Sequence, residues 1–394
     1  MAQLSLTVDA EKSLRILIST SSYTIRFWRR LIENLPSGAE GNAIPVWNQN
    51  LPSFSRALAP RRLYEEIREM QPDVLVTDMP AGQGLHLELL RAAGMTRARY
   101  VIYLRGDIWT ELDLQVHQQR SRLLSSFAVQ ELLSYSRTWL AEKSLRTQLT
   151  RADALLVICK WLQGRAHEEL HGKMETRVLY QGVDPSMFYR DEEIPLRHPN
   201  VGILQTYNIY PKAQALADFR NVIERMQDVH FYIVKGTPLD EIGGARYFGT
   251  VLKALRDLQN VHWVEPLDYP TGVRRFLSSC DVYALVSGLD CCPTTLLEAS
   301  LVEAPILASR VGGIPELVVQ GETGFCIDND DSNEWIAKIR LLQNDPSLAK
   351  RLGGAARTYV ANRFNWQVIA RDLVSHLAET MIHSHEDAQH SRMP

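Results

Sequence analysis

The sequence lacks the features that mark disulfide-rich, membrane-spanning, secreted or nucleic-acid-binding proteins. Its 394 residues hold five cysteines and no C-x-x-C pair, which suits a reducing compartment better than a disulfide framework. No apolar run approaches the ~20 residues needed to span a bilayer, and no secretory signal is visible. The net charge of −3 argues against nucleic-acid binding. We therefore expect a cytoplasmic protein without disulfides.

The remaining composition is typical of a soluble globular protein. Hydrophobic residues make up 45% of the chain and charged residues 23%. A length of 394 residues exceeds one typical core, so two domains are expected. Short apolar runs alternate with helical patterns in both halves, which predicts α/β domains.

Residues 287–316 form the stretch around which the rest of the chain is organised. The apolar run 282–286 just before it predicts a buried strand. Pro293 suits the first turn of a helix over residues 294–302, and residues 306–309 predict the next strand. A strand, a turn, a helix and a second strand therefore follow one another here.

The start of this helix is suited to bind phosphate. Its first N–H groups lack partners within the helix and attract anions. Glu298 lies five residues past Pro293, about 7.5 Å along the axis at ~1.5 Å per residue. A nucleotide could therefore place its diphosphate on the helix start and its ribose against Glu298.

Four motifs in order resemble the donor site of the retaining glycosyltransferases of family 4, also called glycosyl transferases group 1. Asp290 and Glu298 are eight residues apart, and Gly-Gly-Ile-Pro-Glu at 312–316 and Gly-Glu-Thr-Gly at 321–324 follow. The resemblance implies the GT-B fold, an α/β fold of two Rossmann-like domains facing across a cleft. The family usually has two glutamates where this chain has Asp290 and Glu298. The alternative is an ordinary strand–turn–helix with a solvated acid.

The resemblance also implies a role for each donor-site residue. Asp290 would hold the sugar hydroxyls, Lys212 the diphosphate and Glu298 the ribose. The other donor-binding residues that it implies are Gly202, Lys235, Gly236, Pro266, Cys291, Cys292, Pro293, Thr294 and Thr295.

One cation of the family's donor site is missing. An arginine usually follows the glycine at position 202, and Ile203 stands there instead. Lys212 fits the lysine that ends the same loop, with a merely solvated lysine as the alternative. Either another cation, Arg105 or Lys160, supplies the second positive charge, or transfer is weak.

The first half of the chain carries the candidate acceptor-side residues. Arg105 follows a predicted strand where the family usually has a histidine, and arginine cannot act as a general base. It can bind a phosphate bidentately, so we expect a catalytic role for it. Asp107 would contact a sugar hydroxyl or hold Arg105, and the alternative is a buried structural pair. The loop 19–23 has serines where the family has glycines.

Further predicted elements complete the first domain. We expect a helix over 25–35 that either lies on an anionic membrane surface or packs in the core with a basic edge. Apolar residues over 114–149 predict one long helix or two. The remaining predictions are strands over 14–18, 73–78, 100–104 and 152–159, a turn over 81–84 and a helix over 86–93.

The second half follows the same pattern. Strands are expected over 201–204, 231–234 and 261–264, and helices over 273–277, 333–342 and 347–359. We predict an acceptor domain over 1–190, completed by a helix over about 365–382, and a nucleotide-sugar domain over 191–364. Residues 383–394, with three histidines, are predicted as a disordered tail, with metal binding as the alternative.

The predicted function is retaining transfer of a hexose from a UDP- or GDP-sugar to a hydroxyl acceptor that is a glycan, lipid or small molecule. No cofactor and no metal are expected, because this fold usually works without metal. Partners would be the nucleotide sugar, a carbohydrate or lipid-linked acceptor and the inner membrane face. A nucleotide-sugar epimerase and a catalytically impaired nucleotide-sugar-binding protein are the alternatives.

Overall fold

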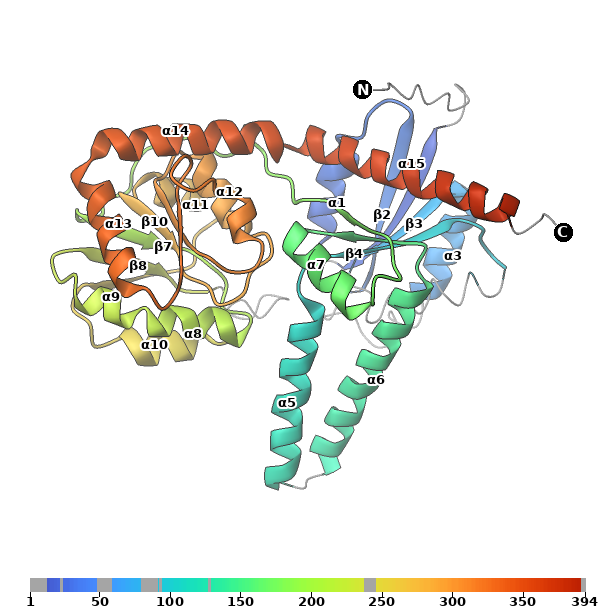
Figure 1. The fold of residues 1–394 in the computed structure, drawn as a ribbon, viewed down its shortest axis with the longest axis horizontal. Coiled ribbons are helices and arrows are strands. Elements are labelled where there is room, and N and C mark those ends of the chain that lie inside the picture. The colour runs from blue at the N-terminus through green and yellow to red at the C-terminus, as the bar shows by residue number, and fades with distance from the viewer. Residues whose placement is uncertain are drawn as a thin grey trace. The chain divides into compact units, whose positions relative to one another are not determined.

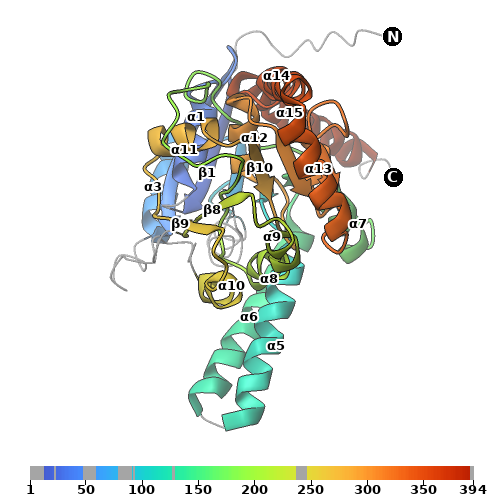
Figure 2. The same cartoon turned by 90° about the vertical axis from the view of Figure 1, so that its left-hand side faces the viewer.

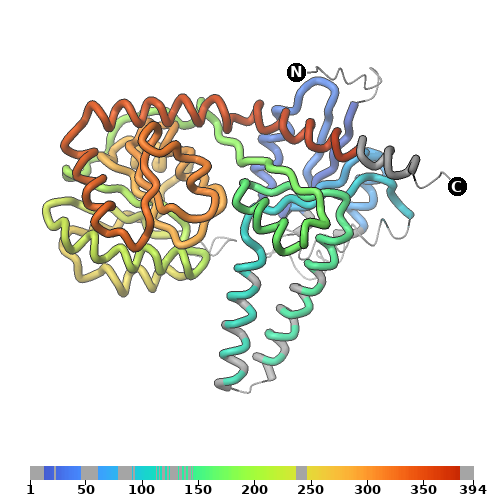
Figure 3. Tube along the Cα trace, in the orientation of Figure 1, coloured from blue at the N-terminus to red at the C-terminus, as the bar shows by residue number. Residues whose placement is uncertain are grey.

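The computed structural model describes residues 13–21, 24–47, 59–78, 91, 94–126, 129–236 and 246–390 (Figure 3). The chain divides into two compact units. The first comprises Met1–Val157, Arg165–Leu179 and Trp366–Pro394, and the second Ile158–Gly164 and Tyr180–Asn365. Our predicted turn over 81–84 and most of the helix over 86–93 lie outside the described residues.

The first unit contains a six-stranded sheet in which every neighbouring pair of strands is parallel. Parallel strands are buried on both faces, which explains their continuous apolar runs. In spatial order the strands are β2 (Ala39–Trp47), β1 (Leu14–Ser21), β3 (Val74–Asp78), β4 (Arg99–Leu104), β5 (Ala154–Val157) and β6 (Thr176–Val178).

Helices α1 (Ile25–Ile32), α3 (Ala59–Met70) and α15 (Trp366–His390) accompany this sheet (Figure 1). In α1, Phe27 and Trp28 are buried, whereas Arg29 and Arg30 are exposed. The aromatic residues of this helix therefore pack in the core, and contact with a membrane stays a prediction that rests on the basic edge. Among the described residues, no helix is long and apolar enough to cross a bilayer.

The long apolar stretch before β5 forms two helices. Helices α5 (Ile108–Ser126) and α6 (Val129–Arg151) run side by side and extend away from the sheet of their unit (Figure 1 and Figure 2). Leu145 and Leu149 at the base of α6 are buried, whereas Trp139 and Leu140 further out are about half exposed. The hairpin is thus attached to the unit by its base.

Helix α15 completes the first unit, as predicted. Trp366 packs edge-on against Phe27 with ring centroids 5.4 Å apart, and His376 Nε2 lies 2.9 Å from the carbonyl oxygen of Val178. The helix continues to His390, so residues 383–390 are helical and not the disordered tail that we predicted. This stretch has neither glycine nor proline to end the helix. Residues 391–394 lie outside the described residues.

The second unit contains another parallel six-stranded sheet. In spatial order its strands are β12 (Phe325–Ile327), β11 (Ile306–Ser309), β10 (Val282–Leu285), β7 (Asn200–Ile203), β8 (His230–Val234) and β9 (Val261–Val264). Its helices are α8 (Tyr210–Asp218), α9 (Arg220–Glu224), α10 (Phe248–Leu255), α11 (Thr271–Ser278), α12 (Thr294–Leu301), α13 (Ser332–Asn344) and α14 (Pro346–Arg363), with a short 3₁₀ turn, η1 (Ile314–Glu316).

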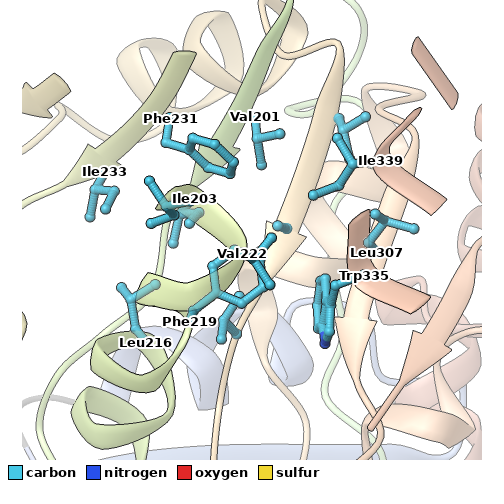
Figure 4. Close-up of a cluster of buried hydrophobic side chains, with 14 of the residues drawn as sticks. Val201, Ile203, Leu216, Phe219, Val222, Phe231, Ile233, Leu307, Trp335 and Ile339 are labelled. Carbon is cyan, nitrogen blue, oxygen red and sulfur yellow. The ribbon is translucent and has the colours of Figure 1, made fainter. Parts of the chain in front are cut away.

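One layer of the core lies between this sheet and helices α8, α9 and α13 (Figure 4). Val201 and Ile203 of β7 alternate toward it, as do Phe231 and Ile233 of β8. Trp335 of α13 fills the same layer. The period of two along each strand selects which side chains enter this core.

The second unit begins earlier than the predicted boundary near residue 190. Val183 N–H donates to the carbonyl of Phe364 at 2.8 Å, and Gln181 hydrogen-bonds to Thr294 Oγ1. These contacts hold residues 180–190 to the second unit. The segment 158–164 also joins it, through helix α7 (Lys160–Glu169), whose first N–H groups bond to Glu316.

Candidate functional site

The carboxyl ends of all six strands of the second unit lie at one edge of its sheet, because the strands are parallel. The loops that follow β7, β10 and β11 meet there. Lys235, Gly236 and Pro266, which we predicted to bind the donor, follow β8 and β9 at this same edge. Lys235 forms an ion pair with Glu265 across the two strand ends.

The structure brings together two of the predicted catalytic residues, Lys212 and Asp290. Lys212 lies in the first turn of α8, and its Nζ is 2.6 Å from Asp290 Oδ2. The two side chains are only 13% and 15% exposed. Lys212 Nζ is also 3.5 Å from Thr206 Oγ1. Lys212 is therefore held by a carboxylate and is not a freely solvated lysine.

Glycines set the backbone distances that make this ion pair possible. A Cβ on Gly288 would lie 2.5 Å from the carbonyl oxygen of Pro211, so the loop after β10 packs directly on the start of α8. Gly312, at φ +55°, leaves no room for a Cβ beside the carbonyl of Asp290. Gly313 N–H donates to that carbonyl at 3.0 Å. Side chains at these positions would push Asp290 away from Lys212.

A hydrogen-bonded clamp fixes the loop after β10 to the neighbouring strand ends. Ser287 N–H donates to Ser309 Oγ at 2.9 Å, and Asn329 Nδ2 donates to the carbonyl of Ser287 at the same distance. Ser309 Oγ in turn bonds to Asn329. The loop that carries Asp290 is thus pre-positioned.

Helix α12 begins directly after this loop. Pro293 is its N-cap residue and has no side-chain oxygen to cap the first N–H groups. Thr295 Oγ1 lies 3.0 Å from the hydroxyl of Tyr283, which is also 2.9 Å from the carbonyl oxygen of Leu204. Cys291 and Cys292 are 5% and 7% exposed, so their thiols pack inward. The helix start is therefore where we predicted it, and its binding of an anion stays a prediction.

Glu298 lies on α12 and is 3% exposed. Burial raises the pKa of its carboxyl to about 7, and a hydrogen bond from Tyr269 opposes the shift. Burial therefore favours the protonated form of Glu298 more than in an exposed glutamate. That Glu298 binds the ribose of the donor stays a prediction.

Ile203 and Gly202 have structural explanations. Ile203 is fully buried in the core layer (Figure 4), where an arginine would bury an unpaired charge. Gly202 lies inside β7, and a Cβ there would collide with Cys280 Sγ. Packing inside the unit accounts for this glycine, which we had assigned to the donor.

Gln205, which the sequence analysis did not select, lies two residues past the end of β7. Its side chain is 7% exposed, and neither amide atom has a hydrogen-bond partner among the described residues. A buried amide of this kind is rare. A polar residue just after a buried strand was the available signal.

The Gly-Gly-Ile-Pro-Glu motif also connects separate segments of the second unit. The carboxylate of Glu316 accepts hydrogen bonds from the backbone N–H groups of Lys160 and Trp161 at 2.8 and 2.7 Å. It also accepts one from Tyr180 OH at 2.7 Å. Glu316 therefore caps the start of α7, and the Lys160 side chain points outward as an exposed group.

Arg105 and Asp107 follow β4 of the first unit. The Arg105 guanidinium carbon lies 4.5 Å above the ring of Phe27. Asp107 caps α5, since Thr110 N–H and Oγ1 donate to its two carboxylate oxygens at 3.1 and 2.6 Å. Its carboxylate is also 3.8 Å from Arg165. The structure thus gives Asp107 a capping role, and a catalytic role for either residue stays a prediction.

Asp78, at the end of β3, is a further residue that the sequence analysis did not select. It is fully buried and accepts a hydrogen bond from Trp28 Nε1 at 2.9 Å. Burial raises the pKa of its carboxyl, and the nearby positive charge of Arg105 opposes that shift. The charges of Asp78 and Arg105 therefore interact at the carboxyl ends of β3 and β4.

The described residues contain no group of three or more His, Cys, Asp or Glu side chains placed to hold a metal ion. Asp328 and Asp330 have Asp-x-Asp spacing, and Asp328 pairs with Arg310 at 3.2 Å. Metal independence stays a prediction.

Comparison with known proteins confirms the resemblance. Residues 215–359 match the family described as glycosyl transferases group 1. The chain is 25% identical over 230 residues to N-acetyl-alpha-D-glucosaminyl L-malate synthase of Bacillus anthracis. That match covers 57% of this chain and 59% of the relative, so the chain spans little more than half of the relative's length.

Solved structures confirm the fold over nearly the whole chain. Sucrose-phosphate synthase from Thermosynechococcus elongatus aligns with a TM-score of 0.69 at 16% identity, covering 94% of this chain and 99% of that one. HepE of Anabaena in complex with UDP-glucose aligns with a TM-score of 0.62 at 16% identity, covering 93% and 99%. At this identity the likeness shows the fold alone, which is the expected GT-B fold.

Proposed function

Because residues 215–359 match glycosyl transferases group 1, we propose that this protein transfers a hexose from a nucleotide-diphosphate sugar to a hydroxyl acceptor. The observation that carries this proposal is the Lys212–Asp290 ion pair of 2.6 Å at the sheet edge where α12 begins. It puts a cation for a diphosphate and a carboxylate for sugar hydroxyls beside a helix start that favours anions.

Each of these groups has a task in the transfer. The bond between the sugar's anomeric carbon and the diphosphate oxygen breaks, and negative charge grows on the leaving diphosphate. Lys212 and the N–H groups at the start of α12 stabilise that charge. Asp290 orients the sugar through its hydroxyls, and Glu298 holds the ribose.

We propose that the configuration at the anomeric carbon is retained, as in family 4. The acceptor hydroxyl attacks from the face that the diphosphate leaves, and its proton passes to the departing phosphate oxygen. Such a front-face reaction needs no protein nucleophile.

A UDP-hexose is the first donor to test. HepE of Anabaena, a structural neighbour, was solved with UDP-glucose, which supports a nucleotide-diphosphate hexose as donor. A carbohydrate or lipid-linked hydroxyl compound is the proposed acceptor class.

A second candidate function is nucleotide-sugar binding without efficient transfer. The burial of Ile203 favours it, because the cation that the family usually places there is absent. In that case the protein would bind the donor and leave it intact.

The test is a panel of UDP- and GDP-hexoses with sugar and glycerol acceptors, with release of nucleoside diphosphate followed by chromatography and product by intact mass. We expect wild-type release and product, and loss of at least ~100-fold in Asp290→Ala, comparable with losing one transition-state group. Asp228→Ala, which removes a surface carboxylate paired with Arg340, is the matched control and should keep activity.

A chelator arm of the same assay tests metal independence. We expect full activity in excess chelator, because protein groups meet the charge of the diphosphate. Activity that disappears with chelator and returns with Mg²⁺ would contradict this. Donor binding without transfer would favour the second candidate, and no binding at all would overturn both.

A further inference from the structure

We propose that the Lys212–Asp290 ion pair makes the site discriminate between the nucleotide sugar and the free nucleoside diphosphate. In this inference, which rests on the proposed function, Asp290 holds Lys212 while no sugar is bound. The hydroxyl groups of a bound sugar then donate hydrogen bonds to the carboxylate of Asp290. Lys212 is thereby freed to bind the diphosphate. The released product, which has no sugar, cannot do so and binds weakly.

The geometry supports competition for Lys212. Its Nζ has Asp290 Oδ2 at 2.6 Å and Thr206 Oγ1 at 3.5 Å, so the carboxylate is the close partner. With exposures of 13% and 15%, the pair is less screened than a surface ion pair. A diphosphate that reaches for Lys212 must displace this carboxylate or approach a like charge.

The backbone that carries the Asp290 carboxylate cannot simply move aside. The backbone of Asp290 is fixed by the Gly313 N–H bond of 3.0 Å and by the close approach of Gly312. Pro211, next to Lys212, is packed on Gly288. Both ends of the ion pair are therefore anchored, and only the side chains can adjust.

The two ligands differ in what they offer Asp290. A nucleotide sugar brings hydroxyl donors that can satisfy the carboxylate when Lys212 leaves it. A free nucleoside diphosphate brings no donor at that position, so the partly buried carboxylate would lose its partner. The same ion pair therefore penalises the product more than the donor and favours product release.

The test measures UDP binding by calorimetry, with wild type, Asp290→Asn and the control Asp228→Asn. Asparagine keeps the shape of Asp290 and removes its charge. We expect Asp290→Asn to bind UDP roughly 3- to 30-fold more tightly than wild type, in the range of a partly buried ion pair. Asp228→Asn should match wild type. GDP is titrated in parallel and replaces UDP if wild type binds only GDP.

The variants Lys212→Met and Lys212→Met/Asp290→Asn separate release of Lys212 from simple like-charge repulsion. If the diphosphate and Asp290 compete for Lys212, the gain in UDP affinity caused by Asp290→Asn should fall to less than about 2-fold when Lys212 is also changed to Met. A gain that persists there overturns the inference, as does unchanged UDP affinity in Asp290→Asn with a lowered melting temperature. Both results leave the proposed function standing, whereas a wild-type protein that binds neither UDP nor GDP overturns the two together.

Discussion

At the scale of single residues, carboxyl groups within each of the two units have very different surroundings. Asp290 is paired with Lys212, whereas Glu298 is buried on α12 with a pKa raised to about 7. Asp78 in the first unit is buried with its pKa raised in the same direction. Charged groups held away from water in this way are concentrated at functional sites.

The raised pKa of Glu298 predicts how stability depends on pH. A carboxyl whose pKa in the folded state exceeds its ordinary 4.5 stabilises the protein fully below pH 4.5, and this contribution is lost as the pH rises through about 7. At about 1.4 kcal/mol per pKa unit, the loss between pH 5 and pH 8 is about 2 to 3 kcal/mol. Glu298→Gln should abolish it.

Urea unfolding at pH 5, 6, 7 and 8 measures this effect as the difference between wild type and Glu298→Gln. Other titrating groups are common to both proteins and cancel in the difference. The exposed Glu322, changed to Gln, is the control and should leave the pH profile unchanged. Parallel profiles for wild type and Glu298→Gln would contradict the raised pKa.

At the scale of elements, turns without side chains hold the site together. Gly312 and Gly313 lie against the carbonyls of Asp290 and Cys291, and η1 follows directly with the Glu316 cap of α7. One short motif therefore supports both the Asp290 loop and the start of another helix.

Gly313→Ala should destabilise the protein and weaken nucleotide binding. Its Cβ would collide with the carbonyl of Cys291 and lie 2.7 Å from Cys159 Sγ, so backbone must move. We expect a loss of about 1 to 3 kcal/mol in the free energy of unfolding, typical of overpacking. Thermal unfolding and UDP calorimetry measure the two effects.

Gly354→Ala in α14 is the matched control. A Cβ at position 354 would meet nothing within 4 Å, and alanine has a higher helix propensity than glycine. This change should raise stability by about 0.4 to 1 kcal/mol and leave UDP affinity unchanged. Similar losses of stability and UDP affinity in both variants would show that the lack of space around Gly313 does not cause the effect of Gly313→Ala.

At the scale of the whole molecule, the last helix returns to the first unit after the chain has formed the second. Ile369, Leu373 and Leu377 of α15 recur at helical spacing and are fully buried. Trp366 and His376 add contacts to Phe27 and Val178. The first unit therefore needs the C-terminal end of the sequence for its core.

Leu373→Ala should destabilise the first unit by about 2 to 5 kcal/mol, the range for a large-to-small change in a core. Hydrogen exchange, read by mass spectrometry, should speed up in peptides of β1, β3 and β4 and stay unchanged in those of β7 and β10. Asp372→Ala, an exposed neighbour, is the control. Faster exchange confined to the second unit would contradict the placement of α15.

The sequence by itself determined the class of fold and the start of α12. Apolar runs, Pro293 and the glycines act within a few residues of themselves, so most buried strands and the helices α11, α12, α13 and α14 were predicted within a few residues. Helix α15 was predicted at its start but runs on to His390, past its predicted end. β2 was missed, because Gly41 and Pro45 interrupt its apolar pattern. The strands β6 and β12 and the helices α3, α7, α8, α9 and α10 were missed as well. Of these, α9, β6 and β12 are too brief for a clear period.

Only the tertiary structure decided how the site residues meet. Lys212 and Asp290 pair because the sheet order and three glycine contacts join loops that are far apart in the chain. The burial of Ile203 and the raised pKa of Glu298 depend on what packs above each strand and helix. Such contacts are set by long-range packing, and local residue preferences carry no information about them.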